Sequence, residues 1–256
     1  MNEVDSNTAL AMLDWQIELG ADEAIGDTPV NRYDVPAKPA PRKTDAPKAE
    51  AAASADPVAE ARAAAAGSAD LEELRAALGT FEHCGLKQGA RNLVFSDGHA
   101  SARLMIVGEA PGRDEDIQGK PFVGRAGQLL DRMLAAIGHA RTDETPNNGV
   151  YITNVLPWRP PQNRDPTKEE MGMMRPFVER HVALVDPDVV VLMGNISCEV
   201  GLGVRGITRL RGKWTESYGK PCLPMFHPAY LLRNPAAKKE AWADLLELDA
   251  RLGNSA

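Results

Sequence analysis

One segment constrains the fold of this chain more than any other. An apolar run, residues 104–107, leads into the turn Gly108-Glu109-Ala110-Pro111-Gly112, and a helical pattern covers residues 126–137. This order predicts a strand, a sharp turn with a long loop, and a helix. Ligands of α/β sheets bind at the carboxyl ends of strands, so the acids that follow this strand indicate a site: Glu109, Asp114, Glu115 and Asp116. A solvated loop is the simpler alternative.

Two other predicted strands also end in polar residues. Residues 150–153 form an apolar run that ends at Asn154, and residues 222–226 lead to His227. Pro228 follows His227 and biases it towards an extended backbone. Three strand ends therefore carry carboxylates, an amide and an imidazole.

Strand and helix patterns alternate through most of the chain. The predicted strands cover residues 104–107, 150–153, 188–193, 212–216 and 222–226, and the predicted helices cover residues 69–78, 126–137, 167–185, 197–202 and 235–252. Residues 189–192 are apolar without alternation, which is typical of a strand buried on both faces. The alternation predicts a parallel sheet with helices on both faces.

The N-terminal quarter has a different composition. Residues 1–34 form an extension with an amphipathic helix predicted over 7–20, and residues 35–68 are rich in Ala and Pro, which predicts a disordered linker. We expect the folded domain to cover residues 69–256. Of the 36 acidic and 29 basic residues, 12 and 6 lie in residues 1–68, so the remaining domain is nearly neutral.

Composition also limits the setting of the chain. Its three cysteines are far apart and show no disulfide or C-x-x-C pattern. No stretch is long and apolar enough to cross a membrane, and the acidic start is unlike a signal peptide. These features favour a cytoplasmic protein. A basic stretch could meet phosphates or could be an exposed hairpin: Arg205, Arg209, Arg211 and Lys213.

Three segments resemble motifs of the uracil-DNA glycosylase superfamily, in particular its family 4. They are the run from Gly108 to Gly127, then Asn154 with residues 159–167, then His227-Pro228-Ala229-Tyr230-Leu231-Leu232-Arg233. The resemblance covers residues 78–251 and keeps the order of the family's motifs. It implies a three-layer α/β/α fold with a mostly parallel four-stranded sheet. It also implies a monomeric enzyme that removes uracil from single- or double-stranded DNA and so initiates base excision repair.

The chain departs from the family at the metal centre. Family 4 enzymes hold a four-iron four-sulfur cluster on four cysteines, and here only Cys84 matches, with Phe81, Trp158 and Met174 at the other three positions. One thiolate cannot hold the cluster. We therefore expect a variant without cluster, metal or other cofactor, in which these apolar side chains form a small core around a buried thiol.

The resemblance also implies roles for the motif residues. Asn154 would read the edge of an extruded uracil, Phe122 would stack on the base, and His227 would stabilise the departing uracil anion. The same segments would supply the rest of the base pocket: Gly108, Ala110, Pro111, Gly112 and Asp116. Ala110 occupies the position of an aspartate in better-known groups, so another acid must position the water. Glu109 lies nearest the strand end and ranks first, Glu115 ranks second, and Asp116 could instead bind a loop backbone group.

The last motif is expected to form a loop that enters the duplex. Leu231 and Leu232 would be an apolar wedge, or alternatively would pack a helix, and Arg233 would meet phosphate. Tyr230, Arg159 and Arg164 complete the expected DNA contacts.

Three alternatives stay open beside uracil excision. One is a non-catalytic module that binds DNA with a degenerated site. Another is an enzyme of the same fold for other bases, such as deaminated purines. A third is a covalent uracil trap, which we do not expect because residues 156–162 lack the histidine that this group carries.

Overall fold

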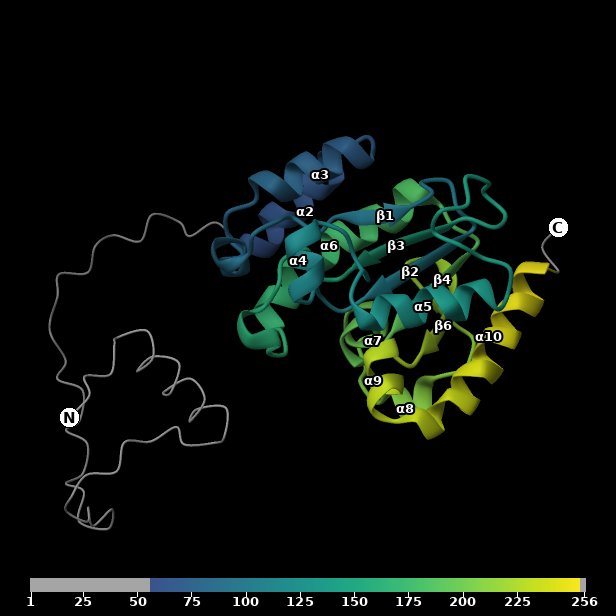
Figure 1. The fold of residues 1–256 in the computed structure, drawn as a ribbon. Helices are drawn as coiled ribbons and strands as arrows, with labels where there is room; N and C mark the ends of the chain where they lie inside the picture. Colours follow the sequence, from purple (N-terminus) through teal and green to yellow (C-terminus); the bar gives the residue numbers. More distant parts are fainter. Residues whose placement is uncertain (1–55, 254–256) are drawn as a thin grey trace, which may run out of the picture. The chain divides into compact units, whose positions relative to one another are not determined.

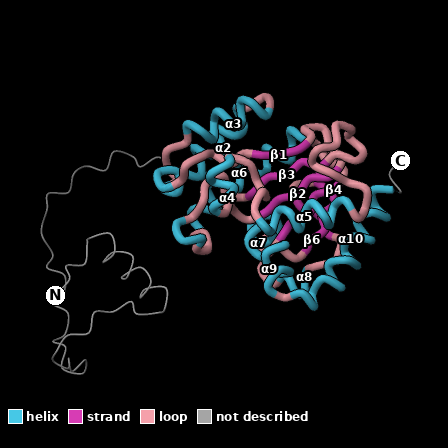
Figure 2. Tube along the Cα trace, in the orientation of Figure 1, coloured by secondary structure: helices cyan, strands magenta, loops and turns pink. Residues whose placement is uncertain are grey.

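The strands form one mixed sheet in the order β1-β3-β2-β4-β6-β5 (Figure 2). The computed structural model describes residues 56–253 (Figure 1). The central strands β2 (Leu104–Gly108), β3 (Val150–Asn154), β4 (Val189–Met193) and β6 (Lys220–Met225) are parallel. β1 (Ser96–Gly98) and β5 (Thr215–Ser217) add an antiparallel strand at each edge. The α/β class is confirmed. The sheet has six strands within the described residues rather than the expected four, because one antiparallel strand pairs at each edge.

Helices cover both faces of the sheet, as the alternation predicted. α5 (Arg125–Ala135), α9 (Pro228–Arg233) and α10 (Lys238–Gly253) pack together on one face, and α6 (Lys168–Val185) and α7 (Asn195–Leu202) lie on the other (Figure 1). All residues of β2, β3 and β4 are buried, which explains their unbroken apolar runs. No helix within residues 56–253 has the length and apolar character needed to cross a membrane.

Short helices complete the connections between these elements. α4 (Arg113–Gln118) follows β2, and α8 (Ile207–Leu210) packs against β6. Single 3-10 turns occur at Gly85–Gly89, Pro161–Asn163 and Pro235–Ala237. α6 begins where the sequence predicts, because Thr167 and Glu170 form a reciprocal capping box at its start.

The N-terminal boundary of the domain differs from the prediction. α2 (Pro57–Gly67) lies inside the segment expected to be a disordered linker, and with α3 (Leu71–Thr80) it packs on α6. Ala61 and Ala65 are buried in this contact. Alanine-rich sequence looks like low complexity, yet alanine is also the best helix former, and tertiary packing stabilises the helix here. The predicted helix at 7–20 and the first part of the linker lie outside the described residues.

Candidate active site

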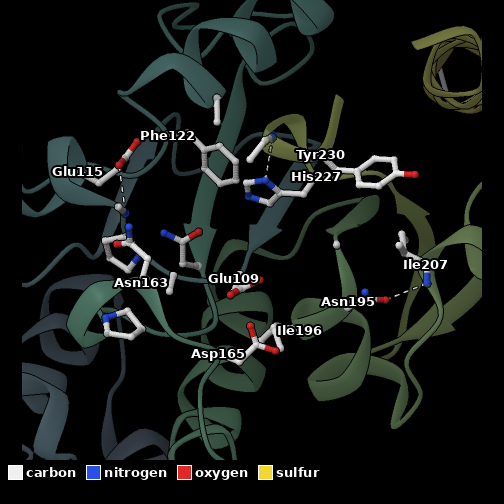
Figure 3. A pocket seen from close by; sticks show the side chains of 18 of the residues that line it. Glu109, Glu115, Phe122, Asn163, Asp165, Asn195, Ile196, Ile207, His227 and Tyr230 are labelled. Carbon is white, nitrogen blue, oxygen red and sulfur yellow. Dashed lines mark hydrogen bonds between the residues drawn. The ribbon is translucent and has the colours of Figure 1, made fainter. Parts of the chain in front are cut away.

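The carboxyl ends of the four parallel strands meet at one edge of the sheet and surround a cavity of about 520 Å³ (Figure 3). The register places Gly108 of β2 directly beside Asn154 of β3. Most predicted pocket residues line this cavity: Glu109, Ala110, Pro111, Gly112, Glu115, Phe122, Asn154 and His227. The structure thus brings together three segments that are spread over more than 100 residues of the chain.

Asn154 presents an unpaired amide to the cavity. Its side chain is 6% exposed, and its Oδ1 accepts no hydrogen bond from any described residue. Gly108 makes room for this amide, because a Cβ there would lie 2.3 Å from Oδ1 and 2.5 Å from the Phe122 ring. A buried acceptor without a donor costs free energy, so the site is suited to a ligand that carries an N–H.

Phe122 is held in place by its backbone and by His227. Its φ of 53° is in the left-handed region, and its carbonyl accepts a hydrogen bond of 2.9 Å from Nη2 of Arg141. The Phe122 and His227 rings stack with centroids 5.3 Å apart and an interplanar angle of 28° (Figure 3). The Arg141 side chain, which comes from another loop, thus holds Phe122 in a strained backbone conformation of the kind that clusters at functional sites.

His227 is a neutral donor. Its Nδ1 accepts a hydrogen bond of 3.1 Å from the backbone N–H of Ala229, so the proton of the neutral ring is on Nε2. Burial, with a smaller contribution from the positive charge of Arg233, lowers the pKa of His227 to about 4. At neutral pH the imidazole therefore offers one N–H and carries no charge.

Glu109 is the acid that faces the cavity. It lies at the end of β2, and its side chain has no hydrogen-bond partner among residues 56–253 (Figure 3). Burial raises the pKa of Glu109 above its usual value, the nearby Asp165 raises it further, and Arg205 opposes both. A partly buried carboxyl with a raised pKa at a cavity wall is a typical candidate for general base.

Glu115 binds backbone groups instead. Its Oε2 accepts from the N–H of Gly112 at 3.1 Å, and its Oε1 accepts from the N–H groups of Val123 and Gly124 at 2.9 and 2.8 Å. Three backbone N–H groups occupy both carboxylate oxygens, so this geometry does not support the expected catalytic role. Glu115 instead joins the loops that carry Pro111 and Phe122.

Asp116 was expected in the base pocket, and it does not line the cavity. It is buried, and its Oδ1 accepts from the backbone N–H groups of Arg91 and Asn92 at 2.8 and 3.3 Å. The alternative role, a bond to a loop backbone group, is the correct one. Its side chain points away from the cavity because it belongs to α4, where Glu115 and Asp116 leave the helix in different directions.

The segment expected to enter the duplex as a loop is the helix α9. Leu231 is 1% exposed and belongs to the core, so it cannot be a wedge, and Leu232 is partly buried. Tyr230 and Arg233 do line the cavity. For Leu231 the structure therefore shows the second alternative, a leucine that packs a helix against the core.

The two arginines expected on DNA are engaged within the protein. Arg164 donates to both carboxylate oxygens of Glu170, at 2.9 and 2.6 Å. Arg159 donates to Oδ1 of Asn163 at 2.9 Å. Arg164 lines the cavity but shares its charge with Glu170, which makes it a structural residue of the loop before α6.

Sequence reasoning gave no role to three polar residues of the cavity wall: Asn163, Asp165 and Asn195. Asn195 comes just after the end of β4, and a polar residue at a strand end is a sequence signal that could have identified it as part of the site. Its Oδ1 accepts hydrogen bonds from the N–H groups of Gly206 and Ile207 (Figure 3). Arg205 also lines the cavity, and two of the four residues of the basic stretch are engaged in ion pairs. Arg205 pairs with Glu199 and Asp165, and Arg211 pairs with Asp244.

The residues at the expected cluster positions do not fit an iron-sulfur cluster. Phe81, Trp158 and Met174 are 6%, 3% and 0% exposed and belong to the hydrophobic core, as does Cys84. Burial raises the pKa of the Cys84 thiol, which disfavours the thiolate that a metal requires. Within residues 56–253 no group of three or more His, Cys, Asp or Glu side chains could hold a metal ion.

The fold and the site together define a class: an α/β protein with a pocket for a flat ring, lined by an amide, an aromatic face and a neutral imidazole. The family model of the uracil DNA glycosylase superfamily matches residues 95–246, and the chain belongs to this superfamily.

Individual relatives of known type show which group within the superfamily the chain resembles. A Type-4 uracil-DNA glycosylase of Archaeoglobus fulgidus is 39% identical over 179 residues, which cover 66% of this chain and 87% of that protein. A Type-4 enzyme of Thermotoga maritima is 40% identical over 154 residues, or 59% of this chain and 77% of that protein. A Type-5 uracil-DNA glycosylase of Pyrobaculum aerophilum is 30% identical over 146 residues, or 52% and 64%. The chain is thus family 4-like.

Proposed function

We propose that this protein is a DNA glycosylase that removes uracil from DNA and so initiates base excision repair. The observation that carries the proposal is the buried Asn154 amide, whose Oδ1 has no partner in a cavity that also holds Phe122, His227 and Glu109. The Type-4 relatives, which are named for uracil-DNA glycosylase activity, support the same substrate.

Asn154 would select the base. Its Oδ1 accepts from uracil N3–H and its Nδ2 donates to uracil O4. Cytosine presents an acceptor at N3 and a donor at N4, so each contact would become a clash of like groups. A site built to pair a substrate N–H rejects the analogue that lacks it.

His227 would stabilise the leaving group. When the bond between N1 and C1′ breaks, its electron pair goes to the base, and negative charge develops at N1 and O2. The Nε2–H of a neutral imidazole can donate to O2 without giving up its proton, and it costs no reorganisation because the Ala229 N–H already fixes the ring.

Glu109 would position the nucleophile. Water attacks C1′ as the base departs, and its proton passes to the Glu109 carboxylate, while the same charge stabilises the cationic sugar of the transition state. The products are free uracil and an abasic site. The target base must first leave the duplex, or be unpaired in a single strand, because none of these groups reaches a stacked base. We further propose that a monomer carries out the reaction without a cofactor.

The proposal is tested with purified protein and oligonucleotides that carry one uracil, in single strands and opposite guanine or adenine. Alkali cleaves abasic sites, so strand scission after incubation reports base release. Matched oligonucleotides with thymine, hypoxanthine or xanthine at the same position separate uracil excision from the alternative specificity. Binding without scission on every substrate would instead support a non-catalytic DNA-binding module, and a protein–DNA species stable to denaturation would support a covalent trap.

A further inference from the structure

Tyr230 is the aromatic residue among the α9 side chains that line the cavity, and neither leucine expected to enter the duplex lines it. Leu231 is 1% exposed within the core, whereas Tyr230 is partly buried and lines the cavity. In Figure 3 the Tyr230 ring lies beyond His227 as seen from Phe122, at the rim of the site. An aromatic side chain therefore lies at the edge of the cavity that is proposed to hold the extruded base.

The Tyr230 ring packs against a second aromatic ring, that of Phe226. Its ring stacks on Phe226 with centroids 4.8 Å apart and an interplanar angle of 26°. Phe226 is buried and directly precedes His227. A parallel stack covers one face of a ring and leaves the other for a further planar group, in an offset arrangement favoured by aromatic pairs.

The Arg211–Asp244 ion pair lies against Phe226, on the side of the stack outside the cavity lining. The guanidinium carbon of Arg211 lies 5.7 Å from the centroid of Phe226, over the ring. Arg211 donates from Nε to Oδ2 of Asp244 at 2.8 Å, from Nη2 to Oδ1 of the same carboxylate, and from Nη2 to the carbonyl of Glu240 at 2.8 Å. Asp244 is 1% exposed on α10, outside the cavity lining. Buried ion pairs contribute little net stability, so this one needs another explanation, and the placement of Phe226 supplies it.

We propose that Tyr230 stacks on the DNA base next to the extruded uridine, and that Arg211 and Asp244 position Tyr230 through Phe226. The stack would replace the base contact that extrusion removes. Because this rests on the proposed uracil excision, the test compares duplex with single-stranded substrate, in which no gap in a double helix has to be filled.

The first variants are Tyr230→Ala and Tyr230→Phe. We expect Tyr230→Ala to lower kcat/KM on duplex uracil by roughly 5- to 150-fold, the range of one lost base–aromatic stack, and to lower it on the single strand far less. Tyr230→Phe keeps the ring and should recover most of the duplex activity. Trp242→Ala removes an exposed ring from α10 outside the cavity and serves as the matched control.

The second variants test positioning. Arg211→Lys keeps a charge for Asp244 but lacks the planar group and the paired donors, so it should show part of the duplex-specific defect. Combined with Tyr230→Ala it should add less than twofold, since both changes remove the same contact. Phe226→Leu, which keeps apolar volume without a ring, should behave like Arg211→Lys and replaces it if that variant fails to fold.

The outcomes separate the two proposals. An inactive wild type on both substrates would contradict uracil excision itself. An active wild type with equal losses on duplex and single strand for Tyr230→Ala would overturn the stacking role alone. Full additivity of Arg211→Lys and Tyr230→Ala would overturn the positioning role, because a general structural defect would add to the loss of the ring.

Discussion

At the scale of the residue, local environment gives similar side chains different chemistry. Glu109 and Glu115 are six positions apart, yet one is an unpaired acid at the cavity wall and the other is bound by three backbone N–H groups. Asn154 is buried, and its Oδ1 has no donor among residues 56–253, which leaves it free to pair with a ligand. Burial and hydrogen bonding decide which group is free to meet the substrate.

Asn154→Asp should weaken uracil excision and relax discrimination against cytosine. An ionised aspartate repels uracil O4, whereas a protonated one can donate to cytosine N3 and accept from N4. Losing one paired polar contact costs about 1–3 kcal/mol, or roughly 5- to 150-fold in rate. The measurement is the ratio of uracil to cytosine release on otherwise identical oligonucleotides. His227→Ala is the matched comparison, since O2 is common to both bases and the ratio should stay constant. Wild-type uracil activity in Asn154→Asp would show that Asn154 does not read the base.

The fall of kcat/KM on acidification, the acid limb of the pH profile, should follow the protonation of Glu109. Its pKa is raised above the ordinary 4.5, so activity should fall on acidification already above pH 4.5, while His227, with a pKa of about 4, stays neutral there. Asp165→Asn removes a negative charge that raises the pKa of Glu109, so the limb should move to lower pH. Glu109→Gln should lower kcat by about 10²- to 10⁴-fold and abolish the limb. The measurement is kcat/KM between about pH 4 and 8 for the wild type and both variants. An acid limb at the same pH in Asp165→Asn and in the wild type would contradict the assignment of this limb to Glu109.

At the scale of the element, the active-site loops depend on contacts that cross between helices. Glu115 of α4 binds the N–H groups of Gly112 and Gly124, which begin α4 and α5 respectively. On the far side, the loop before α6 is held by Arg164, Glu170 and Thr167. These two loops are thus tied to regular elements by charged side chains, which favours a preformed cavity wall.

Glu115→Gln should destabilise the protein, whereas Glu109→Gln should not. The introduced NH₂ group faces backbone donors, and the unmade hydrogen bonds cost about 1–3 kcal/mol. Glu109 has no partner to lose within the described residues. Denaturant unfolding of both variants beside the wild type gives the comparison. Equal stability of all three proteins would show that Glu115 does not hold the two helix starts together.

At the scale of the whole molecule, a nearly neutral domain has to bind a polyanion. Several arginines near the cavity mouth are exposed and have no acidic partner within residues 56–253: Arg113 next to Gly112, Arg125 next to Ala126, and Arg233. Local cations around the site, rather than net charge, would therefore supply the phosphate contacts.

Alanine at Arg113, Arg125 or Arg233 should each weaken DNA binding and reduce the salt slope of log Kd by about 1, the value of one lost phosphate contact. Arg132→Ala is the control, because this exposed arginine lies towards the other end of α5. Binding would be measured on uncleavable duplex at several salt concentrations. Slopes equal to that of the control would place the phosphate path elsewhere.

The protein should be colourless after aerobic purification and contain no stoichiometric iron. Three of the four expected ligand positions carry buried Phe81, Trp158 and Met174, and the pKa of the remaining Cys84 thiol is raised. Absorbance near 400 nm with about four irons per chain would contradict this, since cysteine-ligated clusters of this type require it. Cys84→Ser should leave iron content equal to that of the wild type.

The order of the central strands and the strand ends that carry the site could be predicted from the amino-acid sequence. Apolar runs such as residues 104–107 and 189–192 report burial locally, and parallel strands must present their carboxyl ends at one edge, so Asn154, His227 and Glu109 could be grouped without coordinates. The start of α6 at Thr167 was likewise predicted, because the residues that cap a helix lie next to it along the chain.

Only the tertiary structure decided which of the grouped side chains are free. The partners of Glu115 and Asp116 come from other segments, as does the packing that buries Leu231. β1 has no apolar pattern and exists because β3 pairs with it, and α2 is stabilised by contact with α6. The direction of a side chain and the pairing of an edge depend on groups distant along the chain, which periodicity and composition do not record.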